Sequence, residues 1–323
     1  MPQLLSGLTE QPRTKWLLFF LVVLAAAFAI DFSGTGLSAL IMPLTGFGPG
    51  DAANATDRLL LAIMLAAFVT ADIFVILRLP FVVQIGVVWA QLLILFLAFF
   101  YSFDLSFPFI AARLPILIFT GAFTTIYVSL ISIGIACVIA MSAALARLSN
   151  NGPAYGIATF YISFFRGTPL LLQVYLIYLG LPQIGVTLEA VPSGIIALSL
   201  CYGAYMAEIF RAGIQGVPDG QAEAGTALGL RRGLVMRKIV LPQAMKLIVP
   251  PTGNQFIAML KDSSLVSVMG VWELMFLART QGRSEFKHFE MLITAALIYW
   301  LISIVFELIQ SRIEAYYGKG DQR

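Results

Sequence analysis

Few side chains in this sequence could do chemistry, and several of them stand inside apolar segments. Lys261 and Asp262 are adjacent opposite charges in one such segment. A charge at the centre of a bilayer costs about 2.5–3.5 kcal/mol on insertion scales, so such residues usually face a cavity or pair up. We therefore expect the two either to line or lock a pathway, or to hold neighbouring helices together. Further candidates beside them are Asn254, Ser263 and Ser264.

A second polar segment, Arg166-Gly167-Thr168-Pro169, interrupts the apolar sequence. Glycine and proline end helices, and broken helices with free backbone groups recur at transport sites. Arg166 and Thr168 are therefore candidates for a gate, although a plain turn would explain the same residues.

A polar stripe at helical spacing runs along the apolar segment 116–145. It contains Thr120, Thr124, Thr125, Tyr127 and Ser129. It either faces a pathway, with Thr124 as the pathway candidate, or bonds to neighbouring helices.

Three further titratable side chains receive structural predictions. Glu208 precedes Arg211 by three residues, which predicts an ion pair on one helix face. Asp72 is isolated in an apolar run and is predicted to be a partnered structural acid. The only histidine, His288, lies in a polar stretch and is predicted to be a surface residue.

The composition indicates a polytopic membrane protein. The 323 residues are 59% hydrophobic and 11% charged, with mean hydropathy +0.90, whereas soluble domains are nearer half apolar and a quarter charged. A net charge of +3 is too small to suggest nucleic acid. Cys137 and Cys201 both lie in apolar runs, which argues against a disulfide or a metal site. There is no G-x-x-x-x-G-K-[ST] motif, so any ATP chemistry must come from another polypeptide.

The hydropathy pattern predicts an all-α chain with about eight spanning helices. The predicted spans are 16–30, 59–77, 81–101, 116–145, 170–181, 193–209, 247–271 and 291–313. A short interfacial helix is possible at 37–44, a shallow helix is expected at 154–165, and 102–115 and 272–290 are read as connections. Prolines at 250 and 251 are expected to interrupt the seventh span.

Charge placement predicts the orientation of these spans. Cytoplasmic loops carry an excess of Lys and Arg. Arg78, Arg147 and the basic stretch 231–238 then fall on one side together with both chain ends. Both termini are therefore predicted to be cytoplasmic, although 279–287 places basic residues on the opposite side.

The longest polar interruption, 221–242, is predicted to form two short helices that meet at a glycine. Pro218 and Asp219 suit a first helical turn, because proline lacks an N–H that would be unpaired there and an acid favours the positive end of the helix dipole. Gly229 suits the stop, where a left-handed residue is often needed. Pro242 is expected to end the second helix. Small residues on the first helix would let it sit close to another surface, as a rigid peg.

These residues resemble a known family. Glu223-Ala224-Gly225, then Gly229, then Ile239, Leu241 and Pro242 resemble the signature loop of the membrane subunits of bacterial ABC importers, with Gly225 where the family has Ala. That glycine is expected to loosen the helix, at about 1 kcal/mol. AYMAEIFRAGIQGVP before the loop, FRGTPLLLQ and NQFIAMLKDSSL resemble the polar amino acid uptake permeases. The resemblance covers roughly 116–317.

The resemblance implies a five-helix permease core at 111–323, with a coupling loop at 214–247 and an accessory three-helix region at 1–110. The ATPase-coupling residues it implies are Gln221, Ala222, Glu223, Ala224, Gly225, Leu228, Gly229 and Leu230. It further implies a non-catalytic subunit in the bacterial cytoplasmic membrane, without a cofactor of its own. Its partners would be two ABC ATPase subunits that hold ATP and Mg, a second permease, a solute-binding protein and an amino acid substrate.

The alternative from another class is a carrier or channel driven by an ion gradient. Asp72 and the Lys261-Asp262 pair are compatible with it, because intramembrane charges can form ion paths. The fixed spacing of the 221–242 loop is not explained by that alternative.

Overall fold

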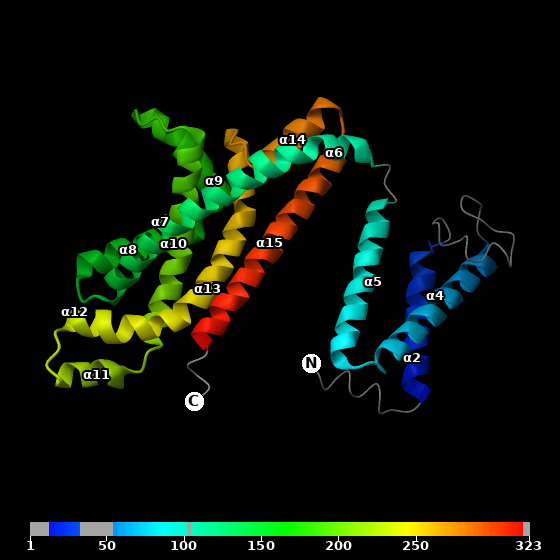
Figure 1. The fold of residues 1–323 in the computed structure, drawn as a ribbon, viewed down its shortest axis with the longest axis horizontal. Coiled ribbons are helices and arrows are strands. Elements are labelled where there is room, and N and C mark those ends of the chain that lie inside the picture. The colour runs from blue at the N-terminus through cyan, green and yellow to red at the C-terminus, as the bar shows by residue number, and fades with distance from the viewer. Residues whose placement is uncertain (1–12, 33–53, 102–104, 319–323) are drawn as a thin grey trace. The chain divides into compact units, whose positions relative to one another are not determined.

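The computed structural model describes residues 13–32, 54–101 and 105–318, and the predicted interfacial helix at 37–44 lies outside them. The chain divides into two compact units, Met1–Asp104 and Leu105–Arg323. Each unit is described by itself below, and Figure 1 shows the helices of both.

The N-terminal unit contains three apolar helices, α2 (Arg13–Ile30), α4 (Ala55–Ile76) and α5 (Phe81–Tyr101). Asp72 on α4 accepts a hydrogen bond from the Gln91 amide of α5 at 2.8 Å. The predicted partner for this acid is therefore present. Its contact with a neutral amide gives Asp72 a structural role between two helices.

The second unit is a helical bundle whose segments range from four-residue turns to a 31-residue helix. They are α6 (Phe107–Ile116), η3 (Leu117–Ala122), α7 (Phe123–Leu148), α8 (Gly152–Gly167), α9 (Leu170–Tyr175), η4 (Leu176–Gly180), η5 (Leu181–Ile184), α10 (Ala190–Gln215), α11 (Asp219–Ala227), α12 (Arg232–Val235), η6 (Met236–Val240), α13 (Leu241–Asp262), η7 (Ser263–Met269), α14 (Leu274–Ser284) and α15 (His288–Gly318). Figure 1 places α11 and α12 at the opposite end of this bundle from α14.

The predicted connection at 102–115 is wrong over most of its length, because the helix already begins at Phe107 and runs to Leu148. Pro108 is tolerated in the first turn, where no N–H partner is needed. Pro115 lies inside the helix and is followed by the π-helical turn η3, which accommodates the missing hydrogen bond. The π-helical turn therefore accommodates Pro115, and the helix continues past it.

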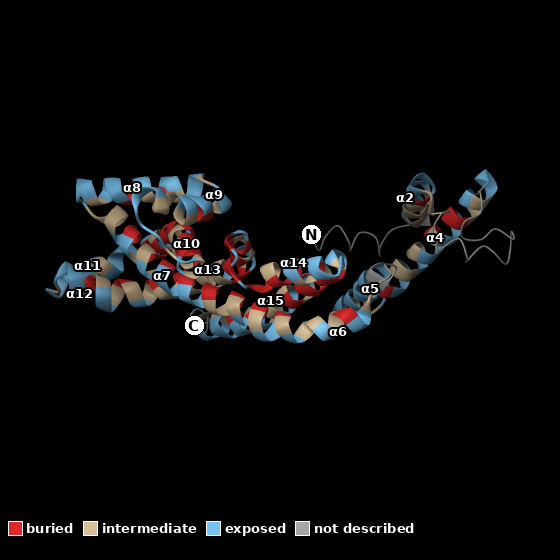
Figure 2. Cartoon of the chain, turned by 90° about the horizontal axis from the view of Figure 1, so that it is seen from above, coloured by how far each residue is buried: buried red, intermediate tan, exposed pale blue. Residues whose placement is uncertain are grey.

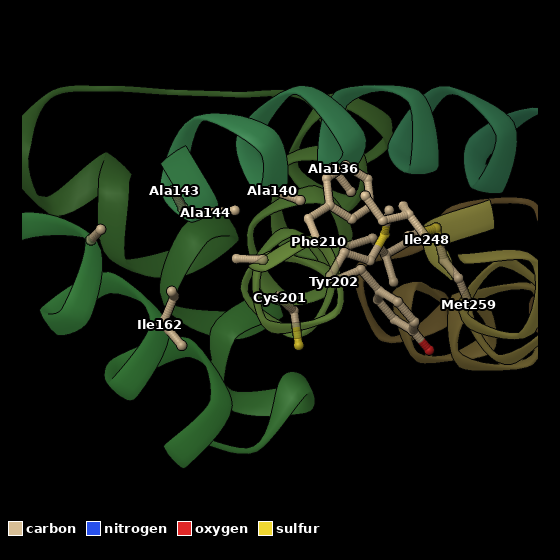
Figure 3. Close-up of a cluster of buried hydrophobic side chains, with 14 of the residues drawn as sticks. Ala136, Ala140, Ala143, Ala144, Ile162, Cys201, Tyr202, Phe210, Ile248 and Met259 are labelled. Atoms are coloured by element: carbon tan, nitrogen blue, oxygen red, sulfur yellow. The ribbon is translucent and has the colours of Figure 1, made fainter. Parts of the chain in front are cut away.

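The core of the second unit forms where α7 packs against α10. In Figure 3 a stripe of alanines on α7 lies beside α10, whereas the side chains of Cys201 and Tyr202 point away from it, Tyr202 towards α13. Small side chains let membrane helices approach closely. Gly203 is the tightest point, since a Cβ there would lie 2.9 Å from Cγ2 of Ile139 on α7.

The helix pair α8 and α9–η5 bends by 108° at the break between Gly167 and Leu170. Thr168 and Pro169 are both extended, which breaks the helix as the sequence predicts. The Gln173 amide donates to the carbonyls of Phe165 and Thr168 at 2.8 and 3.0 Å, and so satisfies carbonyl groups freed by the break.

Two further expectations along the C-terminal third are wrong. Pro242 lies in the first turn of α13 and does not end a helix, and Pro250 and Pro251 lie inside that same helix without breaking it. The segment 272–290, read as a connection, contains the helix α14. Leu274, Leu277 and Ala278 of α14 are buried against α6, η3 and α15, so the apolar face of this helix is covered by distant parts of the chain.

Five described helices are long and apolar enough to cross a membrane, or six if the bent pair counts as one span. The helix α2 is apolar but shorter. The predicted number of eight stays a prediction. Figure 2 shows pale, exposed faces along many of these helices, as expected for surfaces that meet lipid.

Candidate transport and coupling sites

Three residues that the sequence marks as gate candidates line one cavity. Arg166, Thr168 and Asp262 border a space of about 440 Å³ between the α8–α9 break, α10 and α13. Its other lining residues are Gly167, Pro169, Leu170, Cys201, Tyr202, Tyr205 and Gln255. We call this space the Arg166 cavity.

The two charged side chains of the Arg166 cavity are held by tyrosines of α10. The hydroxyl of Tyr202 donates to Oδ2 of Asp262 at 2.7 Å. The Arg166 guanidinium lies over the ring of Tyr205, 5.4 Å from its centroid. A cation and an anion therefore line one cavity of small-molecule size.

Lys261 does not share this cavity with its neighbour Asp262. It lines a second space of about 540 Å³, here called the Lys261 cavity, together with Ser264, Tyr299 and Glu307. The side chains of Lys261 and Asp262 therefore line different cavities. No salt bridge joins them within the described residues. The hydrogen bond from Tyr202 to Asp262 joins α10 to α13, so the structural alternative for this residue, a contact between neighbouring helices, stays open beside the pathway prediction.

The other pathway candidates lie elsewhere. Oδ1 of Asn254 accepts a hydrogen bond from Gln310 at 2.9 Å, which ties α13 to α15. Ser263 is buried and donates to the Leu260 carbonyl. Thr124 is half-buried and does not line either cavity, whereas its neighbour Thr125 accepts from the Leu274 N–H of α14 at 3.3 Å. The polar stripe of α7 thus bonds to a neighbouring helix at this point.

Glu208 organises a charge cluster next to the Arg166 cavity. The predicted pair with Arg211 is confirmed, with the Nη2–Oε2 distance at 2.8 Å. Arg147 at the end of α7 and Arg166 at the end of α8 also pair with Oε1 of Glu208, the latter at 3.8 Å. One carboxylate therefore connects the ends of α7 and α8 to α10. We call these four residues the Glu208 cluster.

The loop after α10 forms the bent peg that the sequence predicts. The α11 helix ends in a Schellman motif, in which the Leu230 N–H reaches the Gly225 carbonyl at 3.1 Å and the Gly229 N–H reaches the Thr226 carbonyl at 2.9 Å. Gly229 has φ of +76°, the left-handed value that favours glycine.

Most of the coupling candidates face away from the bundle. Leu228 at the tip is 81% exposed, and Glu223 is exposed beside it. The remaining exposed members are Gln221, Ala224 and Gly229, whereas Ala222 and Leu230 are half-buried. An exposed apolar side chain at the tip of a rigid turn is suited to contact with another protein.

Gly225 has a structural purpose that the sequence did not reveal. A Cβ at this position would lie 2.5 Å from Cδ1 of Ile239 in η6. The glycine therefore allows α11 to sit directly on the following helical segment, and it is buried there. The predicted loosening of the helix by this glycine is accompanied by a close tertiary contact.

A groove of about 590 Å³ runs between α11 and the segment that follows it. Glu223, Thr226 and Arg232 line it together with apolar side chains of α12 and η6. The peg therefore offers both an exposed tip at Leu228 and a recess lined by Glu223.

At the other end of the bundle, Glu273 is a fully buried acid that caps α14. It accepts the backbone N–H groups of Met275 and Phe276 at 2.8 and 2.6 Å, and the Tyr299 hydroxyl donates to it at 2.7 Å. Burial raises the pKa of this carboxyl to about 7, against the opposing effect of its hydrogen bonds.

Comparison with known proteins decides the family. Residues 136–317 match the family of the binding-protein-dependent transport system inner membrane component. The chain belongs to this family of ABC importer permeases. The probable amino-acid permease protein YxeN of Bacillus subtilis (strain 168) is 36% identical over 217 residues, covering 66% of this chain and 93% of that protein.

A second relative and a solved structure agree. The arginine transport system permease protein ArtQ of Bacillus subtilis (strain 168) is 36% identical over 219 residues, covering 68% of this chain and all of that protein. A crystal structure of an amino acid ABC transporter with histidines has a TM-score of 0.62 and 36% identity, covering 66% of this chain and 100% of that one. These findings favour the importer permease over the ion-gradient carrier or channel.

Sequence reasoning missed several residues of the permease sites. Arg147 was assigned only to topology, yet it pairs with Glu208 from another helix. Tyr202 and Tyr205 were not singled out, although an i,i+3 pair of tyrosines in an apolar helix is a signal for one polar face. Glu273 was absorbed into an expected connection, and only its position just before a helix could have marked it as a cap.

Proposed function

We propose that this permease carries an amino acid through the Arg166 cavity and is driven by a separate ATPase at the α11 peg. The observation that supports the substrate class is the cavity itself. An amino acid is a zwitterion, and Arg166 and Asp262 offer it one cation and one anion within the same 440 Å³ space. Arg166 would take the α-carboxylate and Asp262 the α-ammonium.

The related permeases support the same substrate class. Three of them are named for amino acids, arginine or L-cystine. Tyr202 would orient Asp262, the group that takes the α-ammonium, because its hydroxyl donates to that carboxylate. Tyr205 would hold the Arg166 guanidinium by its ring face.

The coupling role rests on the exposed tip and groove of the peg. An ATPase subunit would receive Leu228 and Glu223, and its movement would be passed into α13 through η6, which continues directly into that helix. The Glu208 cluster lies between the cytoplasmic end of α10 and the Arg166 cavity, and Arg166 belongs to both. A tilt of α10 would therefore reach the cavity through one salt-bridged side chain.

The assembly and its orientation follow from the family and the charge pattern. Two ATPase subunits would bind on the inside, where ATP and Mg belong to them, so this subunit would not be catalytic. A second permease would complete the pathway, and a solute-binding protein would deliver the amino acid from outside. The peg and both chain termini would lie in the cytoplasm of the bacterial inner membrane.

The test is substrate-stimulated ATP hydrolysis by the purified complex of this permease with its ATPase, across a panel of amino acids. Arg166→Gln and Asp262→Asn should each raise the concentration needed for half-maximal stimulation about tenfold, because each removes one charged contact. Deaminated analogues should be penalised in the wild type but not further penalised by Asp262→Asn.

Arg312→Gln is the matched control, because it removes an exposed guanidinium far along α15. It should leave stimulation unchanged. Stimulation by amino acids that is indifferent to Arg166→Gln and Asp262→Asn would move the binding site elsewhere. Transport by the permease alone, without an ATPase, would instead favour the ion-gradient carrier.

A further inference from the structure

The bundle end opposite the peg contains a cavity with a basic wall. It measures about 680 Å³ and lies between η7, α14 and the start of α15. Arg279, Arg283 and His288 line it, together with Met275 and Phe276. We call it the Arg279 cavity. Within the described part of the chain, none of its lining residues is an aspartate or a glutamate.

Basic residues at this end need an explanation, since Lys and Arg are normally concentrated on the cytoplasmic side. Two neighbouring basic residues, Lys287 and Arg113, have a structural explanation. Lys287 donates to the Ser106 hydroxyl at 2.9 Å and lies over the Phe109 ring, and Arg113 pairs with Glu285 at 3.2 Å.

Arg279 and Arg283 have no such partner. Neither forms an ion pair within the described residues, although Arg279 is near enough to the buried Glu273 to influence it. Arg283 stands in the last turn of α14, where a cation is favoured by the helix dipole. The helix dipole therefore accounts for the position of Arg283 but not for that of Arg279. Their i,i+4 spacing puts both on one face of α14, towards the cavity.

The Arg279 cavity also leads towards Lys261. It shares Met275 and Leu292 with the Lys261 cavity, so the two spaces adjoin. Lys261 is a further cation beyond that boundary. An anion held at Arg279 and Arg283 would thus lie next to a cavity that contains a third cation, Lys261, together with the acid Glu307.

We infer that the Arg279 cavity is an outer binding site for the side-chain carboxylate of an acidic amino acid, which makes acidic amino acids the preferred substrates. This inference rests on the proposed function and narrows its substrate class. Two guanidinium groups on one helix face can hold a carboxylate through paired N–H donors. The side chains of Phe276, Met275 and Leu292 provide an apolar wall for the methylene groups.

A cavity of this size favours a small molecule over a docked protein surface. Ligand pockets usually measure about 300–1,000 Å³ and combine apolar walls with a few polar groups. The Arg279 cavity has both properties. Cationic amino acids would be repelled at the same place.

The experiment measures direct binding of radiolabelled L-glutamate and L-glutamine to the purified permease–ATPase complex without the delivery protein. The two ligands have the same shape and differ by one charge. The wild-type complex should bind L-glutamate about tenfold more tightly. Arg279→Gln with Arg283→Gln should remove this preference by weakening L-glutamate alone, and Arg312→Gln should preserve it.

Three results would overturn the inference. Equal affinity of the wild type for both ligands would remove the acidic preference. A preference that survives the double substitution would place it elsewhere. In a separate pull-down with the delivery protein, a double substitution that weakens its docking but leaves L-glutamate binding unchanged would assign the two arginines to the docking surface for that protein.

Failure of the inference can be separated from failure of the proposed function. A complex that hydrolyses ATP in response to neutral amino acids, with no acidic preference, retains the proposed function and loses this inference. A complex that responds to no amino acid loses both. Fluorescence-detected gel filtration of the double variant would show whether it still assembles, and Arg279→Lys with Arg283→Lys should keep part of the preference.

Discussion

Two acids at opposite ends of the bundle, the half-buried Glu208 and the buried Glu273, are compensated in different ways. Glu208, next to the peg, is surrounded by the three guanidinium groups of Arg147, Arg166 and Arg211. Glu273, which caps α14, contacts only backbone N–H groups and the Tyr299 hydroxyl. The first acid is compensated by charge and the second by hydrogen bonds.

This difference has consequences for how each end responds. A carboxylate held by three cations links three helices and stays effective over a wide range of pH, because arginine does not lose its proton. An acid held by neutral donors changes its charge near neutral pH when burial raises its pKa, as it does for Glu273. The end of the bundle with the peg is therefore held by charges that change little with pH, whereas the end with α14 contains an acid that is sensitive to protons.

The largest expected effect comes from Glu208→Gln. The substitution keeps the shape of the side chain but leaves three guanidinium groups close together without an anion. Breaking a buried pair costs about 3–5 kcal/mol, and the partial exposure of these groups places the loss nearer 3 kcal/mol. Thermal unfolding of the solubilised complex should show a clearly lower midpoint.

Glu285→Gln provides the matched control for that measurement. Its pair with Arg113 is exposed, at 46% and 38% of the two side chains, so its loss should cost less than about 1 kcal/mol. Equal effects of the two substitutions would mean that the Glu208 cluster does not hold α7, α8 and α10 together.

The second expected effect concerns Glu273 and pH. Because the pKa of Glu273 is raised in the folded protein from 4.5 to about 7, its protonated form favours the fold. That contribution is complete below about pH 4.5 and is lost as the pH rises through 7. Between pH 5 and pH 8 the free energy of unfolding should fall by about 2 kcal/mol from this group.

Glu273→Gln should remove this pH dependence, because an amide stays neutral, although its single oxygen can accept from only one of the two backbone N–H groups of α14 that Glu273 binds. Unfolding midpoints at pH 5 and pH 8 would then differ less than in the wild type. The variant should be the more stable of the two at pH 8. A wild-type curve that rises between those values would contradict a raised pKa at Glu273.

The sequence predicts local structure correctly where the preferences of single residues or helical spacing determine it. The glycine stop at Gly229 and the break at Thr168-Pro169 depend on backbone preferences of single residues, and both appear in the structure. The Glu208–Arg211 pair depends on helical spacing alone and is also found.

The sequence is a poor guide where distant segments meet. The polar composition of 272–290 concealed α14, because part of its apolar face is covered by helical segments about 150 residues earlier in the chain. The hydrogen bond between Thr125 and Leu274, 149 residues apart, illustrates this. Arg147 lies 61 residues from Glu208, so no helical spacing could predict their pairing. The two cavities likewise require the packing of several helices, which explains why adjacent Lys261 and Asp262 could be read as one site.

The smallest expected effect tests whether close packing, as well as charge, stiffens the coupling end. Gly225→Ala would place a methyl group 2.5 Å from Cδ1 of Ile239, so this flexible side chain must shift. Alanine favours helix by about 1 kcal/mol over glycine, which offsets part of the strain, so the net change in stability should stay within about 1 kcal/mol. The contact between α11 and η6 should nevertheless loosen, and stimulation of the ATPase by substrate should fall.

Gly220→Ala on the same helix is the control, because a Cβ there meets nothing within 4 Å. It should leave the stimulation intact. Ile239→Val combined with Gly225→Ala should restore it, since removal of the terminal methyl group makes room for the new one. If Gly225→Ala alone leaves stimulation unchanged, packing of α11 on Ile239 does not transmit the motion, and the Glu208 cluster becomes the main route between the peg and the Arg166 cavity.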